Sequence, residues 1–175
     1  MKTALIRLLT LILLTATATA GVAGGAMASA GGRAEPREPF EFTVPAGSAC
    51  AGFDLGVEGH GGYVRTKEFE GRGGNLVHIE KGKGSWLTFT NLSSGETFRL
   101  PSSWTTTKYV THPDGTATVT STGHNVLILF PTDHPAGPST TLVVGRYTYD
   151  VDTDGNFTVR SIKGHRTDIC AALAH

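Results

Sequence analysis

Residues 147–159 read YTYDVDTDGNFTV, and this stretch decides the fold class. Tyr147, Tyr149 and Val151 alternate with polar residues, and the alternation resumes after Gly155. Alternation with a period of two predicts a strand with one buried face. An Asp-Gly pair between two such runs is among the stronger hairpin signals. The stretch therefore predicts an antiparallel β-hairpin.

The same alternation recurs on the N-terminal side of this hairpin, broken by turn residues. The alternating runs lie at Phe40–Val44, Phe53–Val57, Leu87–Phe89, Phe98–Leu100 and Ala117–Thr122. Val126–Phe130 is continuously apolar, which predicts a strand buried on both faces. Only Ala171–His175 fits a helical turn. We therefore expect an all-β protein, an antiparallel β-sandwich of about ten short strands, with a closed β-barrel as the alternative.

Residues 1–30 have the features of a secretory signal peptide. Two basic residues precede the apolar run Leu8–Leu14, which passes into Ala, Thr and Gly, and cleavage after Ala20 or Ala30 suits the small-residue rule. The run is shorter than the roughly 20 apolar residues of a membrane-spanning helix. We expect a secreted, extracellular protein with no membrane span after cleavage.

The rest of the chain predicts one domain. Residues 31–38 have no apolar pattern and are expected to be disordered, so the single all-β domain should cover residues 39–175. The whole chain has 15 Lys and Arg against 15 Asp and Glu, and without residues 1–30 the net charge is −2. Because there is no basic excess, composition argues against a nucleic-acid partner.

Cys50 and Cys170 are the only cysteines. An even number of cysteines in an exported protein favours one disulfide. Closing nearly the whole domain in one loop would stabilise it by about 4–5 kcal/mol in the chain-entropy description. Two free thiols, or a catalytic Cys with a His partner, are the alternatives.

The C-terminal half resembles a group of small secreted actinobacterial proteins of unknown function. The segments that carry the resemblance are His112–Gly115, Leu127–Asp133, Pro135–Pro138 and Asp168–Cys170. It covers about Phe40–Leu173 and implies a signal peptide and an all-β domain. The segments are turns and a cysteine, so the resemblance implies no activity and transfers no functional residue.

Asp150, Asp152 and Asp154 lie two residues apart before Gly155, which matches the first half of a calcium loop. The last ligand position, where such loops use a bidentate Glu, is Ser161. A plain hairpin accounts for the same residues without an ion, because the aspartates would face water beside the turn. A weak calcium site and a hairpin turn are therefore both open.

Trp86 is the strongest ligand-binding candidate. It alternates with Leu87 and Phe89, which should face the core, so Trp86 should lie on the outer face and could stack on a sugar ring. Tyr63 offers a similar outward position. The alternative is that a neighbouring loop or the second sheet covers Trp86, since Trp is highly buried on average.

Established catalytic motifs are absent: there is no G-x-S-x-G, H-E-x-x-H or S-x-x-K pattern. The seven His are scattered, and nothing distinguishes Glu58, Glu68, Glu70 or Glu80 from one another. The pattern favours a secreted, non-catalytic protein with an extracellular recognition or structural role. A carbohydrate or cell-surface binding module, with calcium as a possible stabilising ion, is the alternative, and a small secreted enzyme with a loop-built site is a third.

Overall fold

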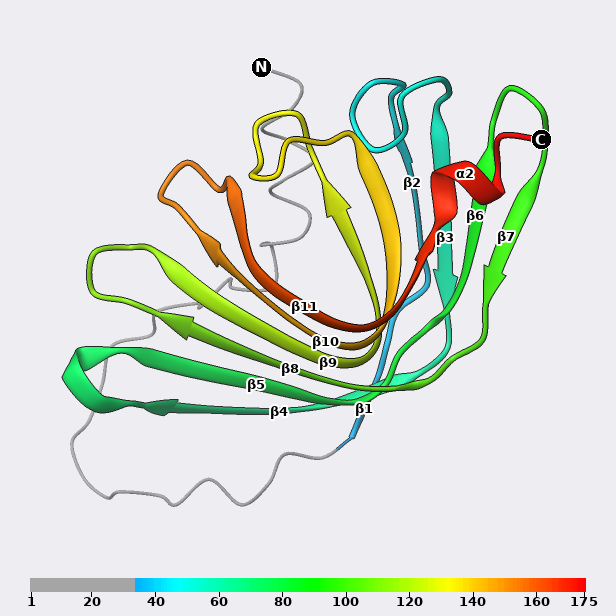
Figure 1. The fold of residues 1–175 in the computed structure, drawn as a ribbon. Coiled ribbons are helices and arrows are strands. Elements are labelled where there is room, and N and C mark those ends of the chain that lie inside the picture. The colour runs from blue at the N-terminus through cyan, green and yellow to red at the C-terminus, as the bar shows by residue number, and fades with distance from the viewer. Residues whose placement is uncertain (1–33) are drawn as a thin grey trace. The chain divides into compact units, whose positions relative to one another are not determined.

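The computed structural model describes residues 34–175, so the expected signal peptide lies outside the described residues. Two antiparallel sheets pack together, which confirms the all-β sandwich (Figure 1). The strands are β1 (Glu35–Pro36), β2 (Phe40–Val44), β3 (Leu55–His60), β4 (Tyr63–Glu70), β5 (Leu76–Lys83), β6 (Trp86–Asn91), β7 (Thr97–Leu100), β8 (Trp104–Thr111), β9 (Ala117–Leu129), β10 (Ser139–Val151) and β11 (Phe157–Asp168).

The larger sheet has the strand order β1-β4-β5-β8-β9-β10-β11, and the smaller sheet has the order β2-β3-β6-β7. Within the described residues, β1 and β11 end the larger sheet without pairing to each other. The alternative of a closed barrel is therefore wrong.

Three of the strands are longer than the sequence pattern predicts. β9 and β10 have 13 residues each and β11 has 12. The alternating run at 117–122 and the apolar run at 126–130 belong to one strand, β9, except for Phe130. The sequence pattern did not predict β4, β5 and β8, because their residues do not alternate clearly between apolar and polar. Both faces of this part of the sheet carry polar and charged side chains.

The chain passes between the two sheets at three corners, twice from the small sheet into the large one and once in the opposite direction. β3 continues into β4, β5 into β6, and β7 into β8, each after only two or three intervening residues (Figure 1). The hydrogen-bond ladder also continues around the corner, where the Gly84 amide donates to the Ser103 carbonyl at 2.8 Å. Strands that change sheets through such bends form the corners of orthogonal β packings.

A row of glycines crosses the large sheet. Gly82, Gly123, Gly145 and Gly164 occupy equivalent positions on β5, β9, β10 and β11, with Thr105 of β8 in the same row. Gly123 and Gly145 have φ values of +108° and +155°. Added Cβ atoms there would meet the carbonyl oxygens of neighbouring strands. The long strands bend at this row, since glycine alone permits that backbone conformation and close approach.

The sandwich core lies between the small sheet and the ends of β9–β11. Leu55 and Phe89 of the small sheet are at most 1% exposed. Thr140 of β10 is fully buried and donates to the Ala49 carbonyl at 3.1 Å. The disulfide between Cys50 and Cys170 is confirmed, with 5.5 Å between the Cα atoms. It ties the loop after β2 to the C-terminal helix, and so holds the two ends of the domain together.

The helical segments within the described residues are short. They are the 3-10 turn η1 (Arg72–Gly74) and the helix α2 (Ile169–Ala172). The Asp168 carboxylate caps α2 by accepting from the Ala171 amide at 3.0 Å. The terminal helical turn thus begins earlier than residues 171–175. In the described part of the chain, no helix is long and apolar enough to cross a membrane.

The segment before residue 39 contributes to the sheet. Glu35 and Pro36 pair with Val64 and Tyr63 of β4. The expectation of disorder over residues 31–38 therefore does not hold for this strand. The described residues belong to one compact unit.

Candidate functional site

The bend gives the large sheet a concave face. Tyr147 on one side of the glycine row packs into one apolar cluster with Val143, Leu127 and Leu129 on the other side. Residues from both sides of a bend meet only on its inner side, so this is the concave face. The strand register assigns two rows of side chains to it, namely Thr66-Glu80-Thr107-Ser121-Tyr147-Ile162 and Glu68-His78-Tyr109-Val119-Tyr149-Val159.

These two rows change in character across the sheet. The β10 and β11 end is apolar, and its Tyr149 and Phe157 rings lie 4.6 Å apart. The β4 and β5 end carries ionisable side chains instead. A molecule lying along the concave face would therefore meet an apolar surface at one end and charged groups at the other.

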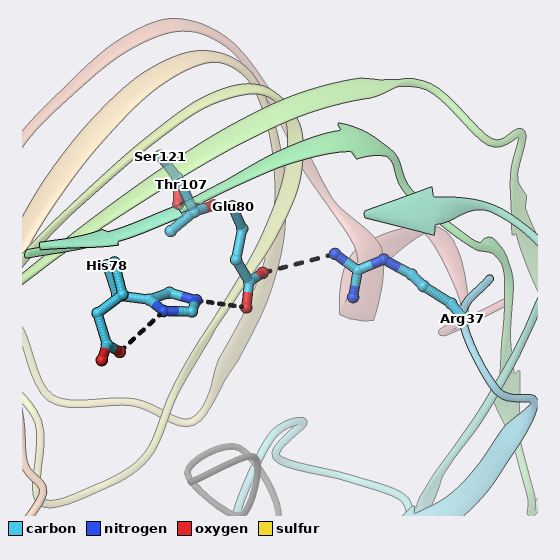
Figure 2. A network of polar contacts seen from close by, with 6 residues as sticks. Arg37, His78, Glu80, Thr107 and Ser121 are labelled. Carbon is cyan, nitrogen blue, oxygen red and sulfur yellow. Dashed lines mark hydrogen bonds and ion pairs between the residues drawn. The ribbon is translucent and has the colours of Figure 1, made fainter. Parts of the chain in front are cut away.

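Four ionisable side chains converge at the β4 and β5 end (Figure 2). His78 lies between two carboxylates: its Nδ1 is 3.5 Å from Glu68 Oε2, and its Nε2 is 3.5 Å from Glu80 Oε1. The second oxygen of Glu80, Oε2, is 3.5 Å from Arg37 Nη2. We call these four residues the concave-face network.

Arg37 reaches this network from the segment between β1 and β2. Its amide donates to the Gly62 carbonyl at 3.3 Å, which fixes the backbone beside the β3–β4 corner. The Arg37, Glu80 and His78 side chains are 33%, 26% and 29% exposed. The network is therefore half-buried yet accessible from solvent.

Hydroxyl and phenol groups surround the network. Thr107 Oγ1 and Ser121 Oγ are 3.0 Å apart, and both lie near Glu80 in Figure 2. The Tyr109 ring lies 5.7 Å from the His78 ring. Burial, followed by the negative charge of Glu80, raises the pKa of Tyr109 above its usual range. This phenol therefore stays protonated and keeps a hydrogen to donate.

The network leaves hydrogen-bonding capacity unused. Among the described residues, the buried atoms Arg37 Nε and His78 Nδ1 have no hydrogen-bond partner. The Glu68 carboxylate lies within ion-pair distance of His78 Nδ1, but this contact does not meet hydrogen-bond geometry. Buried polar atoms are usually satisfied, so these two require an explanation.

Sequence reasoning did not single out this network. Glu68 and Glu80 were candidates among several carboxylates, His78 was one of seven scattered His, and Arg37 fell in the segment expected to be disordered. The available signal was His78 and Glu80 two residues apart, which places both on one face of a strand. Glu68 on β4 and Arg37 before β2 come close to this pair only through strand pairing between segments that are distant in the sequence.

The structure places Trp86 and Tyr63 apart from the concave-face network. Trp86 is 50% exposed on β6, while Phe89 of the same strand is 1% exposed, so the predicted outward orientation of Trp86 is confirmed. Tyr63 packs edge-on against Trp104, with ring centroids 5.8 Å apart. Ligand binding by Trp86 or Tyr63 stays a prediction.

Two of the three aspartates of the calcium hypothesis, Asp150 and Asp152, accept hydrogen bonds at this hairpin. Asp150 Oδ2 accepts from Arg160 Nε at 2.6 Å, and its Oδ1 accepts from Thr118 at 2.9 Å. Asp152 Oδ1 accepts from the amides of Asp154 and Asn156 at 2.9 and 2.8 Å. Hydrogen bonds thus engage the carboxylates of Asp150 and Asp152, whereas Asp154 takes part through its backbone amide.

A shallow depression of about 320 Å³ lies beside Asp150 and Asp152, and His112 and Arg160 also line it. The His112 ring nitrogens lie 3.1 Å from Asn75 Oδ1 and 3.2 Å from Thr118 Oγ1. In residues 34–175, no three His, Cys, Asp or Glu side chains are grouped so that they could hold a metal ion. The arrangement is that of a hydrogen-bonded hairpin end, and calcium binding stays a prediction.

Comparison with known proteins supplies no functional assignment. No family model, no curated protein and no solved structure matches the chain.

Proposed function

We propose that this protein is a secreted recognition protein that binds a saccharide on the concave face of its large sheet. The observation that carries the proposal is the concave-face network, formed by Arg37, Glu68, His78 and Glu80. The disulfide between Cys50 and Cys170 supports an extracellular setting, because such bonds persist in oxidising compartments.

The ion pairs of the network contribute little to the stability of the fold. Partly exposed ion pairs contribute about 0–1 kcal/mol to stability, and all three ion-pair contacts here are at 3.5 Å. An apolar inner face, like that of β9–β11, would stabilise the fold more, since burial of one large apolar side chain contributes about 1.5–3 kcal/mol. Ionisable groups gathered where a core would be favourable are typical of binding sites.

The donor and acceptor set fits a saccharide. Sugar hydroxyls both donate and accept, and the carboxylates of Glu68 and Glu80 accept while Arg37 donates. Tyr109 adds a ring face beside a phenol, and aromatic rings with a polar end suit ligands with one apolar and one polar side. Carbohydrate binding was also the alternative hypothesis from the sequence, although that hypothesis rested on Trp86.

The test is a screen against immobilised neutral saccharides, followed by calorimetry with the sugar that binds. Glu80→Gln keeps the shape of the side chain and removes its charge. We expect its affinity to fall about tenfold or more, because a hydrogen bond to a charged group contributes about 1.5–3 kcal/mol. Glu58→Gln, on an exposed position of β3, is the matched control and should bind like the native protein.

Two results would overturn the proposal. One is the absence of binding to any saccharide. The other is binding that survives Glu80→Gln but is lost in Trp86→Ala, which would move the site to the outer face of the small sheet.

Acid–base catalysis at His78 is the second candidate function. The specific observation is that His78 lies between Glu68 and Glu80, with one carboxylate facing each ring nitrogen. Such a residue can exchange protons with a substrate. Turnover of ester, glycoside or peptide substrates that is lost in His78→Gln would favour this function over simple binding.

A further inference from the structure

The face of the large sheet opposite the concave face carries most of its positive charge. The strand register places seven basic side chains there, which we call the basic face: Arg65, Lys67, Lys81, Lys83, Lys108, Arg146 and Lys163. All seven are exposed. On β4 and β5 the basic residues fall on this face and the acidic residues on the concave face, so the near-zero net charge of the chain conceals a strong difference between the two faces.

The basic face has almost no compensating negative charge. In the part of the chain that the structure describes, none of the seven side chains forms an ion pair with a carboxylate. The register assigns Asp150 to the same face, but Arg160 already neutralises it at 2.6 Å. The positive field is therefore free to act on a partner.

Two cross-strand pairs on this face set like charges opposite each other. Arg65 lies opposite Lys81 on β4 and β5, and Arg146 lies opposite Lys163 on β10 and β11. Like charges at directly opposed positions destabilise a sheet. Folding alone does not account for this arrangement, whereas an anionic partner would relieve the repulsion.

Hydroxyl groups fill the space between the two basic pairs. Thr106 and Thr122 continue the row from Lys81 to Arg146 across β8 and β9. Six neighbouring strands at about 4.8 Å spacing span roughly 24 Å. The basic face is thus an extended strip of alternating charged and hydroxyl groups, which suits a polymer better than a small molecule.

An exposed aromatic pair lies at one edge of the strip. Trp104 is 59% exposed and packs edge-on against Tyr63, and both are paired with Lys83 in the register. Exposed aromatic rings beside hydrogen-bonding groups can stack on sugar rings.

We propose that the basic face is a docking surface for a polyanionic polysaccharide, with the Lys and Arg side chains meeting its anionic groups and the threonines meeting its hydroxyls. Charge complementarity carries the proposal, and the threonine band favours a sugar polymer over a nucleic acid. This surface is separate from the concave-face network, so either site can fail its test without affecting the other.

The probe is polygalacturonate, with neutral dextran as the polymer control and double-stranded DNA as the competing polyanion. We expect the purified chain to bind polygalacturonate in low salt and to lose affinity steeply as salt rises, because bound counterions are released. It should bind dextran and DNA at least about tenfold more weakly.

The decisive variant combines Lys81→Gln, Lys108→Gln and Arg146→Gln, which removes three charges from the basic face. A matched variant with Arg72→Gln, Arg99→Gln and Arg166→Gln removes three exposed charges elsewhere. We expect the first to lose about tenfold or more in affinity, with a shallower salt dependence, and the second to bind nearly normally. Unchanged melting temperatures will show that both variants are folded.

Three outcomes would overturn the proposal. Equal losses in the two variants would indicate attraction by overall charge. Equal or stronger binding to DNA would identify a nucleic-acid surface. Absence of binding to polygalacturonate in low salt would show that the basic face does not bind a polyanionic polysaccharide.

Discussion

Gly123 of β9 and Gly145 of β10 lie directly opposite each other across the longest ladder of the protein. Both have positive φ, and an added Cβ atom would meet the Trp104 carbonyl oxygen at Gly123 and the Lys163 carbonyl oxygen at Gly145. Neither position tolerates a side chain, and the bend that creates the concave face depends on both.

Gly145→Ala should therefore destabilise the protein by about 2–6 kcal/mol, since backbone strain and overpacking each cost about 1–3 kcal/mol. Urea unfolding measures the change. Gly52→Ala is the matched control, because its φ is not in the left-handed region and an added Cβ atom meets nothing within 4 Å. Equal effects of the two substitutions would contradict the role of the glycine row.

Removal of the disulfide should lower the free energy of unfolding by about 2–5 kcal/mol. Cys50 and Cys170 are 120 residues apart and close nearly the whole domain into one loop. Cys50→Ala with Cys170→Ala, and the native protein in reductant, should have the same lowered melting temperature. A melting temperature unaffected by reductant would show that the bond contributes nothing.

Trp86 and Phe89 form an internal comparison on β6. Phe89 is 1% exposed, so Phe89→Ala should cost about 3–5 kcal/mol by creating a cavity in the core. Trp86 is 50% exposed, and Trp86→Ala should cost less than about 1 kcal/mol. Thermal melts of both variants measure these changes in stability. A large loss of stability in Trp86→Ala would contradict the prediction and would mean that this ring stabilises the fold.

Calcium should not change the stability of the protein. The Asp150 carboxylate bonds to Arg160 and Thr118, and Asp152 organises the turn, so binding an ion would break existing hydrogen bonds. Melts in EDTA and in millimolar calcium should coincide. An upward shift with calcium that disappears in Asp152→Ala would instead establish the weak site, through the linkage of ligand binding to stability.

The stability of the β10–β11 hairpin should depend on pH through Asp150. Burial alone raises the pKa of this carboxyl, but the hydrogen bonds from Arg160 and Thr118 outweigh burial and hold the pKa below its usual range. A depressed pKa stabilises the folded state above the unfolded-state pKa of about 3.9, and this contribution is lost as the pH falls through the folded-state value.

Native protein should therefore be more stable than Asp150→Asn at neutral pH, by less than about 1 kcal/mol because the pair is largely exposed. Urea unfolding between pH 7 and pH 2.5 measures this difference, which should shrink below about pH 3.9. A difference that is constant over that range would show that the charge of Asp150 is not involved.

Local patterns were sufficient for part of this structure. The alternation around Asp154 and Gly155 predicted the β10–β11 hairpin, and the even cysteine count together with the expected export predicted the disulfide. The outward orientation of Trp86 followed from its phase relative to Phe89. Each of these inferences needs only the period of a strand or the chemistry of one residue pair.

Local sequence patterns of this kind could not predict the concave-face network. His78 and Glu80 share a face because they lie two residues apart, but Glu68 and Arg37 join them only through the pairing of β4 with β5 and of β1 with β4. Register between strands depends on contacts that are distant along the chain. For the same reason, the neutral composition did not reveal the one-sided charge of the large sheet.

The sequence by itself determined an antiparallel all-β chain with one disulfide and an exposed Trp86, because strand periodicity and cysteine chemistry act locally. The tertiary structure alone decided where the strands bend and which side chains meet. Gly123 and Gly145 appear unremarkable in sequence, and only their alignment across paired strands turns them into a bend, with Glu80 on its inner face and Lys81 on its outer face.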